Sequence, residues 1–288
     1  MEWYVFAIGT AVLASVAAII EKRTLIKENP LEFSTTLGLF NALISLPIIF
    51  FISSNISFGI LLFVYLISLL GTFAFYLVAK AVRHMDISIT SPLLNFESAI
   101  LLVLAILILG EKIAPIQVMG ISILVIGGYL LELPKNLNFN TPLKIFLKSK
   151  YIHFIFLALI IYAFSSLGDK VVLNYMQPLE LILISHLFIA INYVIMISIL
   201  QNGFRSIKHG MKKAWKYTLL MSLFTTSYRI LQAQAMSMTF VSLVIPIKQL
   251  STAISTFFGG EFFHEKRVIF RSLIAIVMVI GAALVILG

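Results

Sequence analysis

Three charged residues lie inside long apolar stretches of the sequence, where charge is costly. Glu97 lies about halfway along one stretch, Arg229 lies midway along a second, and Lys248 lies near the first third of another. If these stretches cross a membrane, each charge near the bilayer centre costs about 2.5–3.5 kcal/mol on insertion scales. Such residues are expected to bind an ionic substrate or a proton. The alternative is an internal ion pair that only stabilises helix packing.

Polar residues at helical spacing extend this candidate site. Lys248, Ser251 and Ser255 fall on one helix face at i, i+3 and i+7. Arg229 shares a face with Gln232 in the same way. Small hydroxyl residues on an intramembrane face also serve close helix packing, so cavity lining and packing are both open interpretations of this stripe.

Ten residues form the predicted substrate-binding or coupling set. In chain order they are Tyr76, Asn95, Glu97, Tyr228, Arg229, Gln232, Lys248, Gln249, Ser251 and Ser255. The sequence has no Walker A run, no His-Glu-x-x-His, no Gly-x-Ser-x-Gly and no His and carboxylate cluster at metal-ligand spacing. We therefore predict no catalytic residue, no metal site, no cofactor and no enzymatic activity.

The composition is that of an integral membrane protein along its whole length. Of the 288 residues, 60% are hydrophobic and 11% charged, whereas a soluble domain has about 25% charged residues. The net charge of +9 does not indicate nucleic-acid binding, because membrane proteins collect Lys and Arg in their cytoplasmic loops. The expected surroundings are the lipid bilayer and a small-molecule substrate.

Ten stretches are long and apolar enough to predict transmembrane helices, each of which needs about 20 mostly apolar residues. They are roughly 3–20, 34–53, 57–80, 87–109, 114–132, 152–168, 180–200, 214–237, 240–260 and 268–287. The long polar linkers lie near 133–150 and 201–213. Glycines at 127, 128 and 281 suit close contact between helices.

The two halves of the sequence repeat each other. Before residue 201 the matching motifs are 148 residues apart, and after the longer loop at 201–213 they are 154 apart. The matched pairs are Glu21-Lys22 with Asp169-Lys170, Pro30-Leu31-Glu32 with Pro178-Leu179-Glu180, Pro92 with Pro246, and Glu111-Lys112 with Glu265-Lys266. Five helices per half is an odd number, so the second half must enter the membrane the opposite way round. This is the inverted repeat of secondary transporters.

The buried charges break this repeat. Glu97 corresponds to Ser251, Arg229 to Phe75 and Lys248 to Leu94. The anion belongs to one half and both cations belong to the other. Packing that is common to both halves cannot explain the three charges, which favours a functional site.

The distribution of Lys and Arg predicts the orientation. Of 21 such residues, Lys112 and Lys170 lie in loops after even-numbered helices, Arg229 and Lys248 lie inside helices, and the other 17 lie in loops after odd-numbered helices. The positive-inside rule then puts the odd-helix loops in the cytoplasm and both termini outside.

Two motifs resemble a known family. Asn95-Phe96-Glu97-Ser98 followed by Leu109-Gly110-Glu111-Lys112 is similar to the fourth-helix signature of EamA-type proteins of the drug/metabolite transporter (DMT) superfamily. Ser98 stands where the family usually has Pro. The resemblance covers essentially the whole chain and implies ten helices in two inverted halves, a central cavity, and transport of amino acids or other small metabolites. It also implies cytoplasmic termini, the reverse of the charge count.

The predicted fold is therefore an all-α integral membrane protein with ten transmembrane helices in two inverted five-helix repeats. Residues 1–133 form the first EamA-like repeat, 134–150 a linker and 151–288 the second repeat. The predicted function is secondary transport of a small polar metabolite, above all an amino acid or related compound, across the cell membrane by alternating access, in the direction of export. The alternatives are transport of phosphorylated or nucleotide-linked solutes, and a non-transporting protein that handles lipid or serves as a structural partner.

Glu97 is predicted to couple transport to protons. Burial and nearby cations act on a carboxyl group in opposite directions, so its protonation can change as the cavity alternates between the two sides. The alternative is a permanent salt bridge that never titrates.

Overall fold

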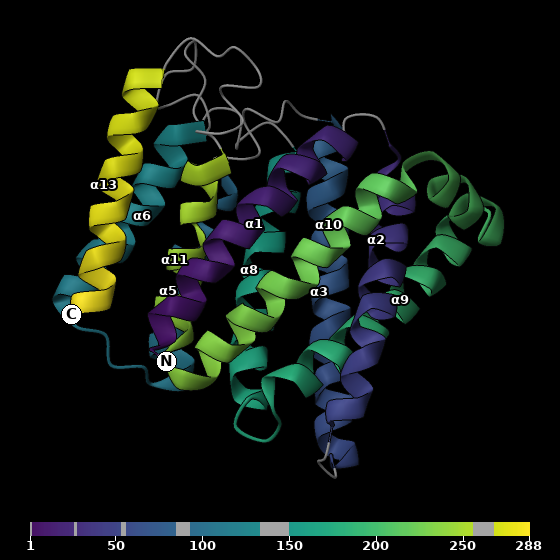
Figure 1. Cartoon of the computed structure of the whole chain (residues 1–288), viewed down its shortest axis with the longest axis horizontal. Helices are drawn as coiled ribbons and strands as arrows, with labels where there is room; N and C mark the ends of the chain where they lie inside the picture. Colours follow the sequence, from purple (N-terminus) through teal and green to yellow (C-terminus); the bar gives the residue numbers. More distant parts are fainter. Residues whose placement is uncertain (1, 26–27, 53–55, 85–92, 133–149, 256–267) are drawn as a thin grey trace.

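The structure is a computed structural model that describes residues 2–25, 28–52, 56–84, 93–132, 150–255 and 268–288, and it is helical (Figure 1). The helices of the first half are α1 (Trp3–Leu25), α2 (Pro30–Ser45) with a 3-10 continuation (Leu46–Phe51), α3 (Phe58–His84), α5 (Glu97–Leu104) with a π-helical continuation (Ala105–Leu109), and α6 (Pro115–Glu132). Those of the second half are α8 (Lys150–Val172), α9 (Pro178–Leu200), α10 (Phe204–Met238), α11 (Val241–Lys248) and α13 (Val268–Leu287).

The prediction of an all-helical membrane protein is confirmed. Within the described residues, five helical segments are long and apolar enough to cross a membrane, namely Trp3–Glu21, Pro30–Phe51, Phe58–Ala81, Tyr151–Val172 and Pro178–Leu200. Shorter apolar helices occupy Glu97–Leu109, Pro115–Leu131, Val241–Ser255 and Ser272–Leu287. Backbone groups in hydrocarbon must be satisfied internally, which is why such sequences form helices. The chain is a multi-pass membrane protein.

Three helices extend beyond their predicted spans. The first and sixth helices continue past residues 20 and 168, to Leu25 and Val172. The polar segment 201–213 is mostly helical, because α10 begins at Phe204 and is 35 residues long. At 1.5 Å per residue α10 spans about 52 Å, which exceeds a hydrocarbon core of about 30 Å. Its cationic first turns therefore project beyond the apolar core.

Two helices that the sequence predicted as continuous are interrupted. A turn at residues 95–96 precedes α5, and a turn at Gln249 separates α11 from the helical residues that follow. At both places an i to i+3 hydrogen bond replaces the regular helical bond, from Phe96 N to Leu93 O and from Gln249 N to Pro246 O. The two interruptions are related by the offset of 154 within one residue. They leave helix ends in the middle of the molecule, beside Glu97 and Lys248.

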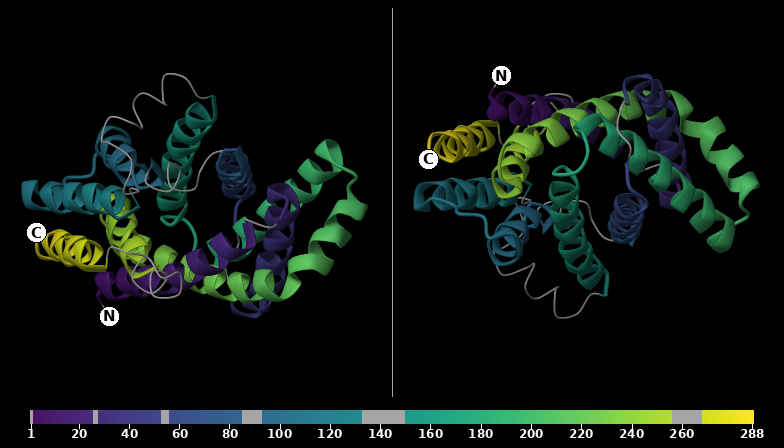
Figure 2. Two further views of the ribbon diagram at one scale, coloured as in Figure 1. Left: turned by 90° about the horizontal axis from the view of Figure 1, so that it is seen from above. Right: turned by 90° about the horizontal axis from the view of Figure 1, so that it is seen from below.

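The helices pack in a pattern that pairs the two halves. The most extensive contacts join α1 to α10, α3 to α8, α6 to α13 and α2 to α10, followed by the contact of α2 with α9. The repeat offset relates α1 to α8 and α3 to α10. The α1–α10 contact and the α3–α8 contact are therefore equivalent to each other under the repeat. In the end-on views α6 and α13 stand beside the remaining helices (Figure 2).

The two ends of the molecule are distinguishable. Both termini and the connections at 110–114, 173–177 and 239–240 lie at the lower end in Figure 1, which we name the terminal face. The C-terminal end of α6 and the N-terminal end of α13 lie at the opposite end, the linker face.

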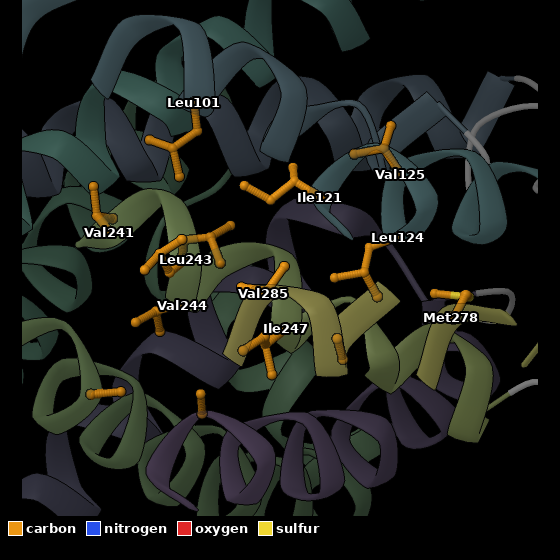
Figure 3. Packing of buried hydrophobic residues seen from close by; sticks show 14 of the residues in the cluster. Leu101, Ile121, Leu124, Val125, Val241, Leu243, Val244, Ile247, Met278 and Val285 are labelled. Atoms are coloured by element: carbon orange, nitrogen blue, oxygen red, sulfur yellow. The ribbon is translucent and has the colours of Figure 1, made fainter. Parts of the chain in front are cut away.

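The principal apolar cluster lies toward the terminal face. It joins α5, α8, α11 and the α6–α13 pair with the beginning of α1 and the end of α10 (Figure 3). Leu101, Leu124, Val244, Ile247 and Val285 are almost fully buried in it. This cluster fills the space between the two halves on the terminal side.

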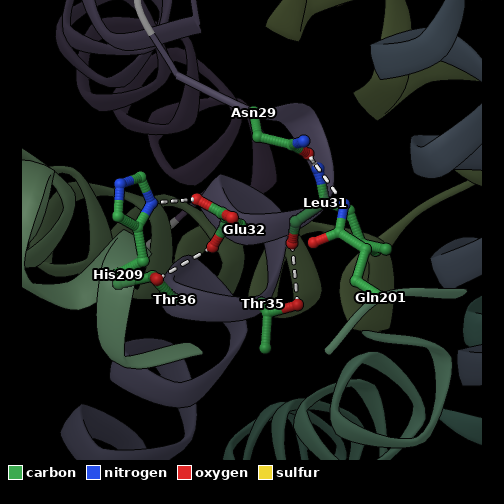
Figure 4. Close-up of polar contacts among 7 residues, drawn as sticks. All are labelled: Asn29, Leu31, Glu32, Thr35, Thr36, Gln201 and His209. Atoms are coloured by element: carbon green, nitrogen blue, oxygen red, sulfur yellow. Dashed lines mark hydrogen bonds and ion pairs between the residues drawn. The ribbon is translucent and has the colours of Figure 1, made fainter. Parts of the chain in front are cut away.

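Polar contacts join three helices on the linker face (Figure 4). Asn29 caps α2 by accepting a hydrogen bond from Leu31 N at 3.0 Å, and it also accepts one from Gln201 Nε2. His209 at the start of α10 lies 2.8 Å from the Glu32 carboxylate on α2. These contacts hold the end of α9 and the beginning of α10 against α2.

Candidate functional site

A cavity of about 390 Å³ lies between the two halves. Residues from helices of both halves line it, and the charged ones are Glu21, Glu97, Asp169, Arg229 and Lys248. The volume lies within the roughly 300–1,000 Å³ typical of small-molecule sites. A cavity with this many ionisable groups has the chemistry to hold an ionic or strongly polar solute.

Arg229 on α10 forms an ion pair with an acidic residue of α8. Its Nη2 lies 3.7 Å from Oδ2 of Asp169. The predicted span 152–168 ends just before Asp169 and Lys170, which would leave both at a solvated helix end, and this expectation was wrong. Asp169 is only 7% exposed, and the Lys170 ammonium instead donates to the carbonyls of Met236 and Thr239.

Lys248 faces the cavity without an acidic partner among the described residues. Its Nζ lies 5.5 Å from the centre of the Tyr228 ring, which stabilises the ammonium by a cation–π interaction. Glu97 and Glu21 also form no ion pair within the described parts of the chain, although both line the same cavity as Lys248. The permanent salt bridge between Glu97 and Lys248 that the sequence left open is therefore not formed.

Neutral polar side chains complete the wall. His186 on α9 shares a 2.7 Å hydrogen bond with the Ser45 hydroxyl, and Ser222 on α10 donates to Asn41 Oδ1 at 2.6 Å. His186 and Asn41 both line the cavity while they bridge helices. The buried side-chain amide oxygen of Gln232, another residue of the cavity wall, has no hydrogen-bond partner among the described residues.

The structure brings together six of the ten predicted site residues. Those on the cavity wall are Glu97, Tyr228, Arg229, Gln232, Lys248 and Ser251. They come from the interrupted fourth and ninth helices and from α10.

The other four predicted residues lie outside the cavity wall. Gln249 donates from Nε2 to the Asn95 carbonyl oxygen at 2.6 Å, which joins the two interrupted helices at their turns. The Ser255 hydroxyl donates to the backbone of Thr252. Tyr76 packs beside Lys80, whose Nζ lies 5.7 Å from its ring. The role of these four in binding a solute stays a prediction.

The sequence profile of the EamA-like transporter family matches residues 1–133 and 149–288. The chain belongs to the EamA-like transporter family. The resemblance noted from the motifs around Glu97 and Glu111 is confirmed. EamA-like proteins are membrane transporters and are normally not enzymes, so this protein is a transporter whose substrate is a small molecule.

One solved structure, named only as "Crystal structure of protein", shares the fold of this EamA-like protein over nearly its whole length. It superposes with a TM-score of 0.77 at 12% sequence identity, and the match covers 98% of this chain and 96% of that one. At this identity the likeness concerns the fold alone. No curated protein matches the sequence.

Reasoning from sequence missed Glu21 and Asp169 as cavity residues of the EamA-like protein. The predicted spans 3–20 and 152–168 end just before these two residues, so the predicted site does not include them. A usable signal was nevertheless present, since the two residues occupy equivalent positions 148 apart and both are acidic.

Proposed function

We propose that this protein is a secondary transporter that moves a small polar metabolite bearing a carboxylate, above all an amino acid or related compound, out of the cell by alternating access. Its membrane is the cell membrane, and protons are the candidate coupling ion. Membership of the EamA-like transporter family supports the transport class. The substrate class and the direction of transport are the new part of the proposal.

The architecture that we propose is ten transmembrane helices in two inverted repeats, at 1–133 and 151–288, joined by a linker at 134–150. The exchange between the α1–α10 and α3–α8 contacts supports it, because a two-fold axis in the membrane plane would produce such pairs. The matched interruptions near Phe96 and Gln249 support it as well.

The observation that carries the substrate proposal is the Lys248 ammonium over the Tyr228 ring, facing the cavity with no acidic partner in the described residues. A carboxylate is the group that would pair with this cation. Glu97 and Glu21 on the same wall would receive a substrate ammonium. An amino acid carries both groups at short separation.

Flux into liposomes that contain the purified protein tests this proposal. We expect uptake of at least one carboxylate-bearing amino compound from a panel of amino acids, sugars, amines and sugar phosphates. Flux of neutral sugars alone would contradict the substrate class. Absence of flux for every solute with a folded protein would favour a non-transporting role in lipid handling or in structural partnership.

A phosphorylated or nucleotide-linked solute is the weaker candidate. It would need both cations, but Arg229 is already held by Asp169 at 3.7 Å. No described contact favours this second candidate over a monocarboxylate.

We further infer that Glu97 carries the coupled proton. It lines the cavity without an ion pair in the described chain, and its repeat counterpart Ser251 on the same wall cannot titrate. The carboxylate can therefore exchange a proton whenever the cavity faces one side.

The Glu97→Gln variant tests the coupling. We expect it to retain exchange of substrate across the liposome membrane and to lose the acceleration by a pH gradient. The matched control is Glu21→Gln, a carboxylate of the same cavity whose counterpart Asp169 is also acidic. Full pH-driven transport by Glu97→Gln would contradict the coupling, and its loss in Glu21→Gln alone would move the role to Glu21.

A further inference from the structure

A buried carboxylate of the first half holds a helix of the second half. Glu111 follows the end of the fourth helix and is only 6% exposed. It accepts hydrogen bonds from Val241 N at 3.0 Å, from Ser242 N at 3.3 Å, and from the Ser242 hydroxyl. Val241 and Ser242 are the first two residues of α11. The carboxylate therefore caps α11, where its charge also suits the positive end of the helix dipole.

Local geometry fixes this carboxylate in place. Gly110 has φ +66°, a left-handed conformation that ends the preceding π-helical turn. The next backbone amide, that of Glu111, donates to Ala105 O at 3.3 Å. Because glycine adopts positive φ without steric cost, the chain turns sharply there and directs Glu111 across the boundary between the halves.

A second side chain fixes the helix on the other side of the same turn. The Lys170 ammonium donates to Met236 O at 2.7 Å and to Thr239 O at 2.8 Å, at the C-terminal end of α10. A cation at this position satisfies carbonyls that have no helical partner. Lys170 and Glu111 thus hold the two ends of the connection between α10 and α11, the helices that carry Arg229 and Lys248.

This connection lies on the terminal face, below the cavity. The principal apolar cluster includes Met236, Val241 and Leu243 at this connection and continues along α11 to Ile247, next to the cavity residue Lys248. The Glu111 bonds join the two halves at the terminal end of this packed region. For solute to reach the terminal face, α11 and the first half must separate there.

We propose that Glu111 is the closure contact of the terminal face: its bonds to Val241 and Ser242 keep the cavity shut on this side, and they break when the cavity opens to it. Lys170 is a positioning residue that keeps the end of α10 in register for this contact. The inference rests on the proposed alternating access, but it concerns accessibility and needs no identified substrate.

The protein has no cysteine, so a single introduced thiol reports accessibility without background. Ser68→Cys places it on the cavity wall in otherwise unchanged full-length protein, reconstituted in one orientation. We measure its labelling by a membrane-impermeant maleimide added at the terminal face. Adding Glu111→Gln removes the carboxylate, and we expect labelling to rise by about tenfold, the equivalent of losing one hydrogen bond to a charged group.

Glu180→Gln is the matched control. Glu180 is also buried, at 1% exposure, and caps the start of its own helix through Gln177 N at 2.9 Å. We expect it to lower the melting temperature without raising the labelling. Equal labelling in the Glu111→Gln and Glu180→Gln proteins would overturn the closure.

If Glu111→Gln does not fold, Ser242→Ala removes only the hydroxyl bond. A smaller rise in labelling then supports the closure, and an unchanged labelling rate overturns it. Because labelling uses no solute, a failed flux screen leaves this result interpretable.

Discussion

Two cations reach the cavity, and their surroundings give them different roles. Arg229 is neutralised by Asp169 on the neighbouring helix α8, with 3.7 Å between the charged groups. Lys248 lies over an aromatic ring and faces the cavity. The first cation is part of the wall, and the second is the candidate contact for an anionic group.

The Asp169–Arg229 pair is expected to stabilise the fold. Asp169→Asn leaves Arg229 without its partner in a largely apolar setting, so we expect a loss of up to about 3 kcal/mol in the free energy of unfolding. The double variant Asp169→Asn with Arg229→Met is expected to regain part of that loss, because no unpaired charge remains. Unfolding in detergent measures both. Equal losses in the single and double variants would show that the charge pair is not the cause.

Lys248 is expected to determine affinity for the carboxylate. Lys248→Met removes the cation while keeping the length of the side chain, and we expect substrate affinity to fall by about tenfold or more. Lys248→Arg keeps the charge and is expected to retain part of the affinity. Equilibrium binding of the substrate found in the flux screen measures the effect. Unchanged affinity in Lys248→Met would remove this residue from the site.

At the scale of elements, α6 and α13 pack through Gly127 and Gly281, two of the glycines predicted to allow close helix contact, and also through Gly120, which was not among those predicted. A Cβ atom at Gly120 would lie 2.6 Å from the backbone oxygen of Gly281, and one at Gly127 would meet the side chain of Met278. A flexible methionine can move aside, whereas the backbone of a packed helix cannot.

This difference predicts unequal effects of the same substitution. Gly120→Ala is expected to cost about 1–3 kcal/mol as overpacking, and Gly127→Ala is expected to cost clearly less. Thermal unfolding of the two variants in one detergent compares them. A larger loss in Gly127→Ala would show that the α6–α13 contact is not limited by the backbone approach at Gly120.

At the scale of the whole molecule, charge separates the two faces. The exposed first turns of α10 carry Arg205, Lys208 and Lys212, and this end of α10 packs on the linker face through His209 and Glu32. The positive-inside rule places this face in the cytoplasm. Both termini, on the opposite face, would then lie outside.

Reporter fusions test the orientation and the inversion together. Reporters at 110–114, at 173–177 and at the C-terminus are expected to lie on one side, and a reporter at 201–203 on the other. A reporter at 173–177 on the side opposite to one at 110–114 would contradict the inverted repeat. A cytoplasmic C-terminus would contradict the charge rule while leaving the repeat intact.

The sequence by itself determined that this is a helical membrane protein, and its motifs indicated the family. Hydropathy is summed over neighbouring residues, so it can be calculated without knowing the fold. A long apolar segment that crosses lipid almost always forms a helix, because its backbone groups must be satisfied internally. The repeat was also readable, because residues such as Pro30 and Pro178 keep a fixed offset.

Only the tertiary structure decided which charges meet. Asp169 and Arg229 are sixty residues apart, and Glu111 and Val241 lie in different halves, so no local pattern connects them. Helical spacing also cannot tell how far along a helix a cavity extends. Ser251 and Ser255 lie one turn apart on the same helical stretch, yet Ser251 lines the cavity and Ser255 does not, because the packing of the other helices sets the depth at which the cavity ends.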